Sequence, residues 1–189
     1  MDVHEEHPGN KLRLKTSYHY MQNTLLKKIL LVFSLAAAAT IGSLRADLSP
    51  HLPKELRTAS NEAIERTELD GKIVGLYFSA SWCPPCRNFT PALVKLRDAH
   101  KDIFEVVLVG FDRGDAAHWK YMRDYKMNFL SMVPGSDESK SLAERFSVRG
   151  IPHLAIIGPD GKVIAQNAVR EVAMNSDAAI QRWKQAAGK

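Results

Sequence analysis

The chain has 189 residues and a formal net charge of +5 at pH 7. Residues 1–46 hold six Lys and Arg against three Asp and Glu, so the remainder of the chain carries only +2. That remainder has no basic stretch with interleaved aromatic residues, which argues against nucleic acid as a partner. Residues 47–189 are numerous enough for one domain with a single core, and we expect a monomer.

Residues 1–46 have the features of an export signal. Two lysines precede an apolar run from Ile29 to Ala39, and small residues follow as far as Ala46. A positive start, a short apolar centre and a small-residue exit are typical of secretory signals, and the run is too short for an ordinary transmembrane span. We expect cleavage after Ala46. Leu44 stands where a small residue is preferred, so an uncleaved membrane anchor remains an alternative.

Translation is expected to start at Met21. The twenty residues before it are polar and show no apolar periodicity, whereas Met21 opens a signal of ordinary length. We therefore divide the chain into an N-terminal extension with signal, residues 1–46, and one domain, residues 47–189. The predicted location is outside the cytoplasm, either periplasmic or secreted.

The first clear strand of the domain precedes the cysteines. Residues 48–66 contain two prolines and predict either a short helix or an irregular approach to an edge strand. The next segment, 73–78, is a nearly continuous apolar run, as expected for a strand covered on both faces. This strand leads directly into Trp82-Cys83-Pro84-Pro85-Cys86.

Cys83 and Cys86 are the only cysteines of the chain. A C-x-x-C pair beside a βαβ pattern indicates a dithiol/disulfide redox site. Positions i and i+3 lie on one side of a helix, and the first helical turn tolerates both prolines because its N–H groups lack intrahelical partners. The helix dipole favours a thiolate at Cys83. We predict that Cys83 is the nucleophile and the less exposed Cys86 the resolving thiol.

Two other interpretations compete with a redox pair. A zinc site commonly needs four ligands, and the chain has no second cysteine pair. A purely structural disulfide is disfavoured because so small a loop removes little entropy from the unfolded chain. We therefore expect no metal and no other cofactor. A metal-binding or cytochrome-assembly chaperone that uses the two thiols as ligands remains an alternative, as does a disulfide-forming oxidase.

The pattern after the cysteines alternates helices and strands. A helix is expected from Cys86 toward His100, with Pro91 inside it. The apolar run 104–111 predicts a second buried strand, which completes a right-handed parallel βαβ unit. A further helix is predicted to end near Lys126. The elements expected after it are an extended stretch at 128–134, a helix capped by Ser136, a strand ending at Ile157, a hairpin strand at 163–165 and a helix over about 177–187.

This order of elements resembles the thioredoxin fold, an α/β fold with a central mixed β-sheet flanked by helices on both faces. Within that superfamily the stretch from Tyr77 to Pro91 is most similar to the tryparedoxin and nucleoredoxin branch. The resemblance extends from about Leu52 to the C-terminus. It implies a cis bond before Pro152, with Pro152 packed against the active disulfide.

The resemblance also suggests how substrate is bound. Pro152, with the Ile151 backbone beside it, would bind a substrate strand through main-chain hydrogen bonds. Trp82 would either shield the disulfide or contact substrate. Arg149 and His153 flank Pro152 and are candidates for stabilising the Cys83 thiolate.

The chain departs at two positions near the thiols from the families that it resembles. Thioredoxins place a buried aspartate where this chain has Tyr77, and tryparedoxins carry Trp-Asp where it has Phe111-Asp112. Asp112 is therefore a candidate proton acceptor for Cys86. We predict a thiol-disulfide oxidoreductase that reduces disulfides of proteins or small thiols and draws electrons from a membrane thiol donor. The trypanothione substrate is not carried over, because an exported protein would not meet it.

Overall fold

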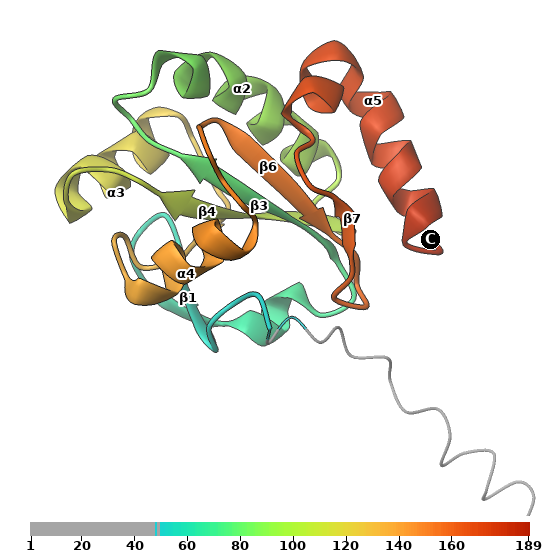
Figure 1. The fold of residues 1–189 in the computed structure, drawn as a ribbon, viewed down its shortest axis with the longest axis horizontal. Coiled ribbons are helices and arrows are strands. Elements are labelled where there is room, and N and C mark those ends of the chain that lie inside the picture. Colours follow the sequence, from blue (N-terminus) through green and yellow to red (C-terminus); the bar gives the residue numbers. More distant parts are fainter. Residues whose placement is uncertain (1–47, 49) are drawn as a thin grey trace, which may run out of the picture. The chain divides into compact units, whose positions relative to one another are not determined.

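A seven-stranded mixed β-sheet forms the centre of the computed structural model, which describes Leu48 and residues 50–189 (Figure 1). The predicted start, signal and cleavage site lie outside these residues. The strands are β1 (Glu55–Arg57), β2 (Ala63–Glu65), β3 (Ile73–Ser79), β4 (Phe104–Gly110), β5 (Leu130–Ser131), β6 (His153–Ile157) and β7 (Val163–Ala165). The helices are η1 (Arg66–Leu69), α2 (Pro84–Ala99), α3 (Asp115–Asp124), α4 (Asp137–Arg145) and α5 (Val169–Ala186).

The sheet order is β2-β1-β5-β4-β3-β6-β7. All seven residues of β3 and all seven of β4 are buried, as their apolar runs predict. The two strands are parallel, and their register pairs Ser79 with Gly110. The segments that follow β3 and β4 therefore leave the sheet at the same end, the carboxyl end of the two strands, and the cysteines lie at this end.

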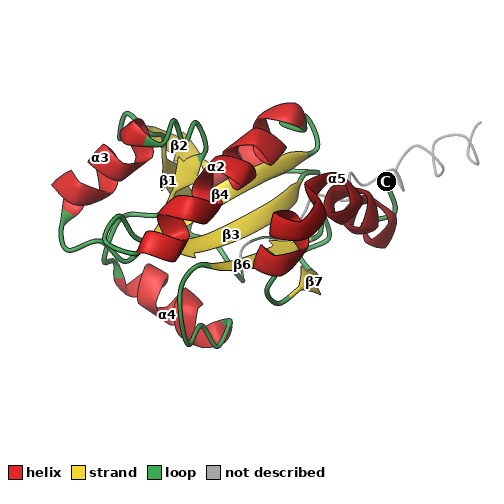
Figure 2. Cartoon of the chain, turned by 90° about the horizontal axis from the view of Figure 1, so that it is seen from above, coloured by secondary structure: helices red, strands yellow, loops and turns green. Residues whose placement is uncertain are grey.

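Helices cover both faces of the sheet, which confirms the predicted thioredoxin fold (Figure 2). Because side chains alternate along a strand, Ile73 and Tyr77 of β3 point into the cluster that contains apolar residues of α2 and α5. Leu76 and Phe78 point into the cluster that contains residues of α4. The hairpin predicted from Pro159-Asp160-Gly161 is present, since β6 pairs antiparallel with β7.

Two segments differ from the prediction. The approach to the sheet is an antiparallel hairpin of β1 and β2, and β1 joins the sheet through the pair Arg57 and Ser131. The final helix begins at Val169, and it contains a non-helical residue, Asn175, whose side-chain oxygen accepts a hydrogen bond from the N–H of Ala178 at 2.9 Å. The predicted helix corresponds to the part after this cap. Burial of the first part against the sheet adds the earlier turns.

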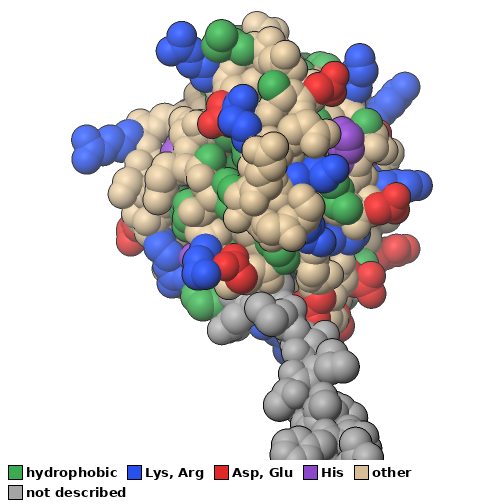
Figure 3. Space-filling view, turned by 90° about the vertical axis from the view of Figure 1, so that its right-hand side faces the viewer, with side chains coloured by type: hydrophobic (Ala, Val, Ile, Leu, Met, Phe, Trp, Pro, Cys, Tyr) green, Lys and Arg blue, Asp and Glu red, His purple; other side chains and the backbone are tan. Residues whose placement is uncertain are grey.

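Within residues 48 and 50–189, no helix combines the length and the apolar character needed to cross a bilayer. On the side of the molecule that carries α5 and β7, basic and acidic side chains are interspersed (Figure 3). This mixed surface agrees with the small net charge of the chain after residue 46.

Candidate active site

Cys83 and Cys86 form a disulfide at the start of α2. Cys83 has extended backbone angles and is the N-cap of the helix, with Pro84 and Pro85 in the first turn. Its Sγ accepts a hydrogen bond from the N–H of Cys86 at 3.3 Å, and the Cα atoms of the pair are 5.3 Å apart. The Cα separation lies in the usual range for disulfides. The local sequence thus places one sulfur at the unsatisfied N–H end of the helix.

The disulfide is almost completely covered. Cys83 is 4% exposed and Cys86 is fully buried, so the order of exposure agrees with the assignment of Cys86 as the inner thiol. The nearby Ala80 and the distant Ile151 pack against the two cysteines and cover the disulfide.

The peptide bond between Ile151 and Pro152 is cis. The carbonyl oxygen of Ile151 lies 3.7 Å from Sγ of Cys83, although 68 residues separate them in the chain. The start of β6 therefore lies against the disulfide, and the backbone of Ile151 is beside the sulfur that would react. The substrate-binding role of this segment stays a prediction.

Trp82 extends from the turn before the cysteines. Its side chain is 54% exposed, and its Nε1 donates a hydrogen bond to the carbonyl oxygen of Phe111 at 2.9 Å. One edge of the indole is thus fixed to the loop after β4, and much of its surface faces solvent. This placement makes the ring available to a substrate that reaches Cys83.

Asp112 follows the carboxyl end of β4, at the end of the sheet that carries the cysteines. Its Oδ1 accepts two hydrogen bonds from Ser81, from the N–H at 2.8 Å and from the hydroxyl at 2.6 Å. Burial raises the pKa of the Asp112 carboxyl, but the neighbouring His118 and the Ser81 donors outweigh it, so this pKa lies below its ordinary value. Asp112 is therefore ionised and supports the loop before the cysteines. Its role as a proton acceptor for Cys86 stays a prediction.

A cluster of hydroxyl groups lies beside the inner cysteine. The carbonyl oxygen of Cys86 accepts hydrogen bonds from Thr90 at 2.8 Å and from Tyr77 at 3.2 Å. Thr90 is also 2.9 Å from the Tyr77 hydroxyl and 2.8 Å from that of Tyr121, which in turn is 3.1 Å from Ser79. Burial raises the pKa of Tyr77 far above its usual value, so the phenol is neutral. These groups relay hydrogen bonds but carry no charge.

The two candidate tuning residues point to different environments. Arg149 is exposed. His153 is buried, and its ring packs edge-on against Phe78 with centroids 5.5 Å apart. Burial lowers the pKa of His153, which keeps the imidazole neutral at pH 7. His153 therefore offers no standing positive charge to a thiolate, and tuning by either residue stays a prediction.

Known proteins share this arrangement. Residues 71–163 match a family model described as thioredoxin-like. Tryparedoxin from Trypanosoma brucei is 36% identical with a TM-score of 0.64, over 72% of this chain and 96% of that one. The chain belongs to the thioredoxin-like family. Membership confirms the predicted oxidoreductase class at the level of the family.

Two further relatives define the branch. Tryparedoxin II in complex with glutathionylspermidine is 32% identical with a TM-score of 0.60, over 67% of this chain and 90% of that one. Nucleoredoxin from Xenopus laevis is 37% identical over 130 residues, which are 66% of this chain but 30% of the relative. The chain thus spans about a third of that nucleoredoxin. The predicted likeness to tryparedoxins and nucleoredoxins is confirmed.

Four buried polar residues beside the site were not predicted from the sequence: Thr90, His118, Tyr121 and Ser131. Thr90 carries a detectable signal, because it lies one helical turn after Cys86 and can bond to that carbonyl. The others reach the site from α3 and β5, and their local patterns indicate only core packing.

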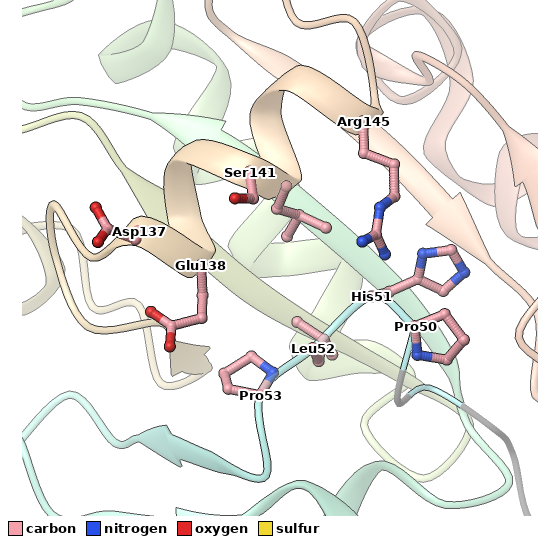
Figure 4. Close-up of a pocket in the computed structure, with 9 residues that line it drawn as sticks. Pro50, His51, Leu52, Pro53, Asp137, Glu138, Ser141 and Arg145 are labelled. Carbon is pink, nitrogen blue, oxygen red and sulfur yellow. The ribbon is translucent and has the colours of Figure 1, made fainter.

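A separate hollow of about 340 Å³ lies between residues 50–53 and α4 (Figure 4). Its apolar lining includes Leu52 and Leu142, and the guanidinium of Arg145 points toward the ring of His51. The residues that line it include none of the predicted site residues. It is therefore distinct from the cysteine pair.

Proposed function

We propose that the chain is a thiol-disulfide oxidoreductase that reduces disulfides by exchange at Cys83 and Cys86. The observation that carries this proposal is a disulfide between the only two cysteines, placed at a helix N-terminus and against the backbone of Ile151. A cysteine in such a position is usually reactive, because N–H groups of the helix stabilise its thiolate.

The reaction proceeds in two exchanges. The Cys83 thiolate attacks one sulfur of the substrate disulfide, forms a mixed disulfide and releases the other sulfur as a thiolate. Cys86, as a thiolate, then attacks Sγ of Cys83 and releases the second substrate thiolate. The protein is left as the Cys83–Cys86 disulfide, and two electrons have passed to the substrate. The proton of Cys86 leaves through a base or water, since the adjacent Tyr77 is neutral.

Thiolate stabilisation at Cys83 has a visible source. The N–H of Cys86 already points at Sγ of Cys83 in the disulfide form. On reduction the same N–H donates to a charged sulfur, which strengthens the bond and stabilises the thiolate. The inner thiol has no exposed surface and is protected from attack by substrate.

The proposed substrates are disulfides of proteins or of small thiols. The exposed ring of Trp82 and the Ile151 backbone flank Cys83 and could contact an extended peptide. A small thiol is supported by the glutathionylspermidine complex of the related tryparedoxin II. The polyamine part of that ligand is not assigned to this chain.

The proposed location of the domain determines which electron donor it needs. The export signal expected in residues 1–46 would place the domain outside the cytoplasm, where disulfides form readily. A reductase there needs a continuous source of electrons, and a membrane thiol transporter is the proposed donor. The proposed unit is a monomer.

Insulin reduction tests the exchange reaction. The wild-type protein should reduce insulin, Cys83→Ser should be inactive, and Cys86→Ser should trap the substrate as a mixed disulfide. A metal-binding chaperone would be inactive in this assay and would bind metal through both thiols. Among the residues that the structure describes, no group of three or more His, Cys, Asp or Glu side chains is arranged as metal ligands.

A further inference from the structure

His118 lies at the centre of a buried polar cluster next to the redox site. It projects from α3 and is fully buried. Its Nε2 is 2.7 Å from the hydroxyl of Ser131 on β5, and its Nδ1 is 3.6 Å from Oδ2 of Asp112 after β4. The ring occupies the space over Gly110, where a Cβ atom would collide with Nδ1. Three elements of the fold thus converge on one imidazole.

The hydrogen-bond pattern points to a proton on Nδ1 of His118. The Ser131 hydroxyl lies 2.7 Å from Nε2, 2.8 Å from the carbonyl oxygen of Met132 and 3.2 Å from that of Leu108, so Nε2 has a partner whether it donates or accepts. Nδ1 and Oδ2 of Asp112 are both buried and have no other hydrogen-bond partner.

A ring proton on Nδ1 satisfies both of these atoms. It points toward Oδ2 of Asp112 across a distance slightly longer than a hydrogen bond. Both side chains are fully buried, and a buried carboxylate oxygen without a donor is costly. The cluster is thus complete when Nδ1 of His118 carries a proton and faces Asp112.

The other oxygen of Asp112 connects this pair to the cysteines. Oδ1 accepts hydrogen bonds from the N–H and the hydroxyl of Ser81, and the carbonyl oxygen of Ser81 accepts one from Arg87 of α2 at 2.7 Å. Ser81 lies two residues before Cys83. The path from His118 through Asp112 to Ser81 therefore ends at the turn that presents the reactive sulfur.

We propose that His118 is a positioning residue of the redox site, which pairs with Asp112 and so holds Ser81 and the turn that carries Cys83. This inference rests on the proposed exchange reaction. Without a donor at Nδ1, the buried Oδ2 of Asp112 has no partner, and the carboxylate no longer holds Ser81 in place. The turn then presents Cys83 less well to the N–H of Cys86, which disfavours the thiolate and so favours the disulfide.

Two substitutions separate positioning from packing. The amide of Asn can take the place of Nδ1 and donate to Asp112, whereas the amide of Gln reaches the place of Nε2 and serves only Ser131. His118→Gln should shift the equilibrium with glutathione about tenfold toward the protein disulfide, or about 30 mV. It should also slow alkylation of Cys83 at pH 7 about tenfold. His118→Asn should stay within about threefold of the wild type in both measurements.

The control variant is Lys120→Ala, which changes the exposed side of the same helix. It should match the wild type in both measurements. Far-UV circular dichroism establishes that each variant is folded. A folded His118→Gln with the wild-type equilibrium and alkylation rate would overturn the proposal, as would equal shifts in His118→Gln and His118→Asn.

A measurement on the wild type covers the case in which a variant does not fold. The ¹⁵N chemical shifts of His118 should report a proton on Nδ1, and an Nδ1 without a proton would overturn the proposal. Failure of the proposed function has a different signature. A wild-type protein that cannot reduce insulin would refute it, while the glutathione equilibrium and the ring protonation would still be measurable.

Discussion

The two sides of the disulfide are supported by chemically different groups. Beside Cys86 lie the neutral hydroxyls of Tyr77 and Thr90, whereas the turn before Cys83 is held by the ionised Asp112 with His118. Neutral hydroxyls lose little on burial when they are mutually bonded, but a buried charge needs a partner of opposite sign. The inner thiol thus lies among groups that maintain packing, and the outer thiol near groups that can change its electrostatic environment.

The largest expected effect comes from removing the buried carboxylate. Asp112→Ala leaves the buried Nδ1 of His118 without a partner and removes the acceptor of both Ser81 donors. We expect a loss of about 3–5 kcal/mol in the free energy of unfolding, measured by urea denaturation, because several buried polar groups lose their partners. The exposed Asp115 at the start of α3 provides a control, because Asp115→Ala should cost under about 1 kcal/mol. Equal losses in the two variants would show that the buried Asp112 contributes no more to stability than a carboxylate on the surface.

Substitutions among the neutral hydroxyl groups beside Cys86 should reduce the free energy of unfolding by less. Thr90→Val keeps the shape of the side chain but deprives the Tyr77 and Tyr121 hydroxyls of a shared partner. We expect a loss of about 2 kcal/mol in the free energy of unfolding. Thr90→Ser retains the hydroxyl and should cost about half as much or less. If Thr90→Ser were as unstable as Thr90→Val, the hydrogen bonds would not be the reason for the loss.

Acid should distinguish the two sides directly. Because the folded-state pKa of Asp112 is lowered, its stabilising contribution is complete above the unfolded value of about 3.9 and is lost as pH falls through the folded value. Unfolding free energies measured below about pH 4 should therefore fall less steeply in Asp112→Asn than in the wild type. Thr90→Val should keep the wild-type slope. Parallel slopes for the wild type and Asp112→Asn would contradict a stabilised carboxylate.

The smallest expected effect concerns the exposed edge of the site. Trp82→Phe removes the hydrogen bond from Nε1 to Phe111 but leaves an aromatic ring over the surface. We expect a change in unfolding free energy below about 1 kcal/mol. If the ring contacts substrate, Trp82→Ala should raise KM for insulin several-fold more than Trp82→Phe does. Identical KM values in the two variants would remove Trp82 from the substrate-binding surface.

Several features of this protein follow from the sequence alone, because their signals are local. The apolar runs at 73–78 and 104–111 contain all the information needed for buried strands, and C-x-x-C spacing with two prolines places Cys83 at a helix start. The Pro159-Asp160-Gly161 turn likewise predicts the hairpin of β6 and β7. In each case neighbouring residues decide the conformation.

Other features were decided only by the tertiary structure. The register of β3 and β4 brings Ser81 to Asp112, 31 residues later, and the parallel pairing of β4 with β5 brings Ser131 to His118. Packing against the sheet likewise extends the final helix before Asn175, where a local cap signals a later start. Such contacts join side chains from separate elements, so no local pattern carries them. The sequence alone therefore indicated the reactive pair, whereas the groups that support it were determined by how the strands align.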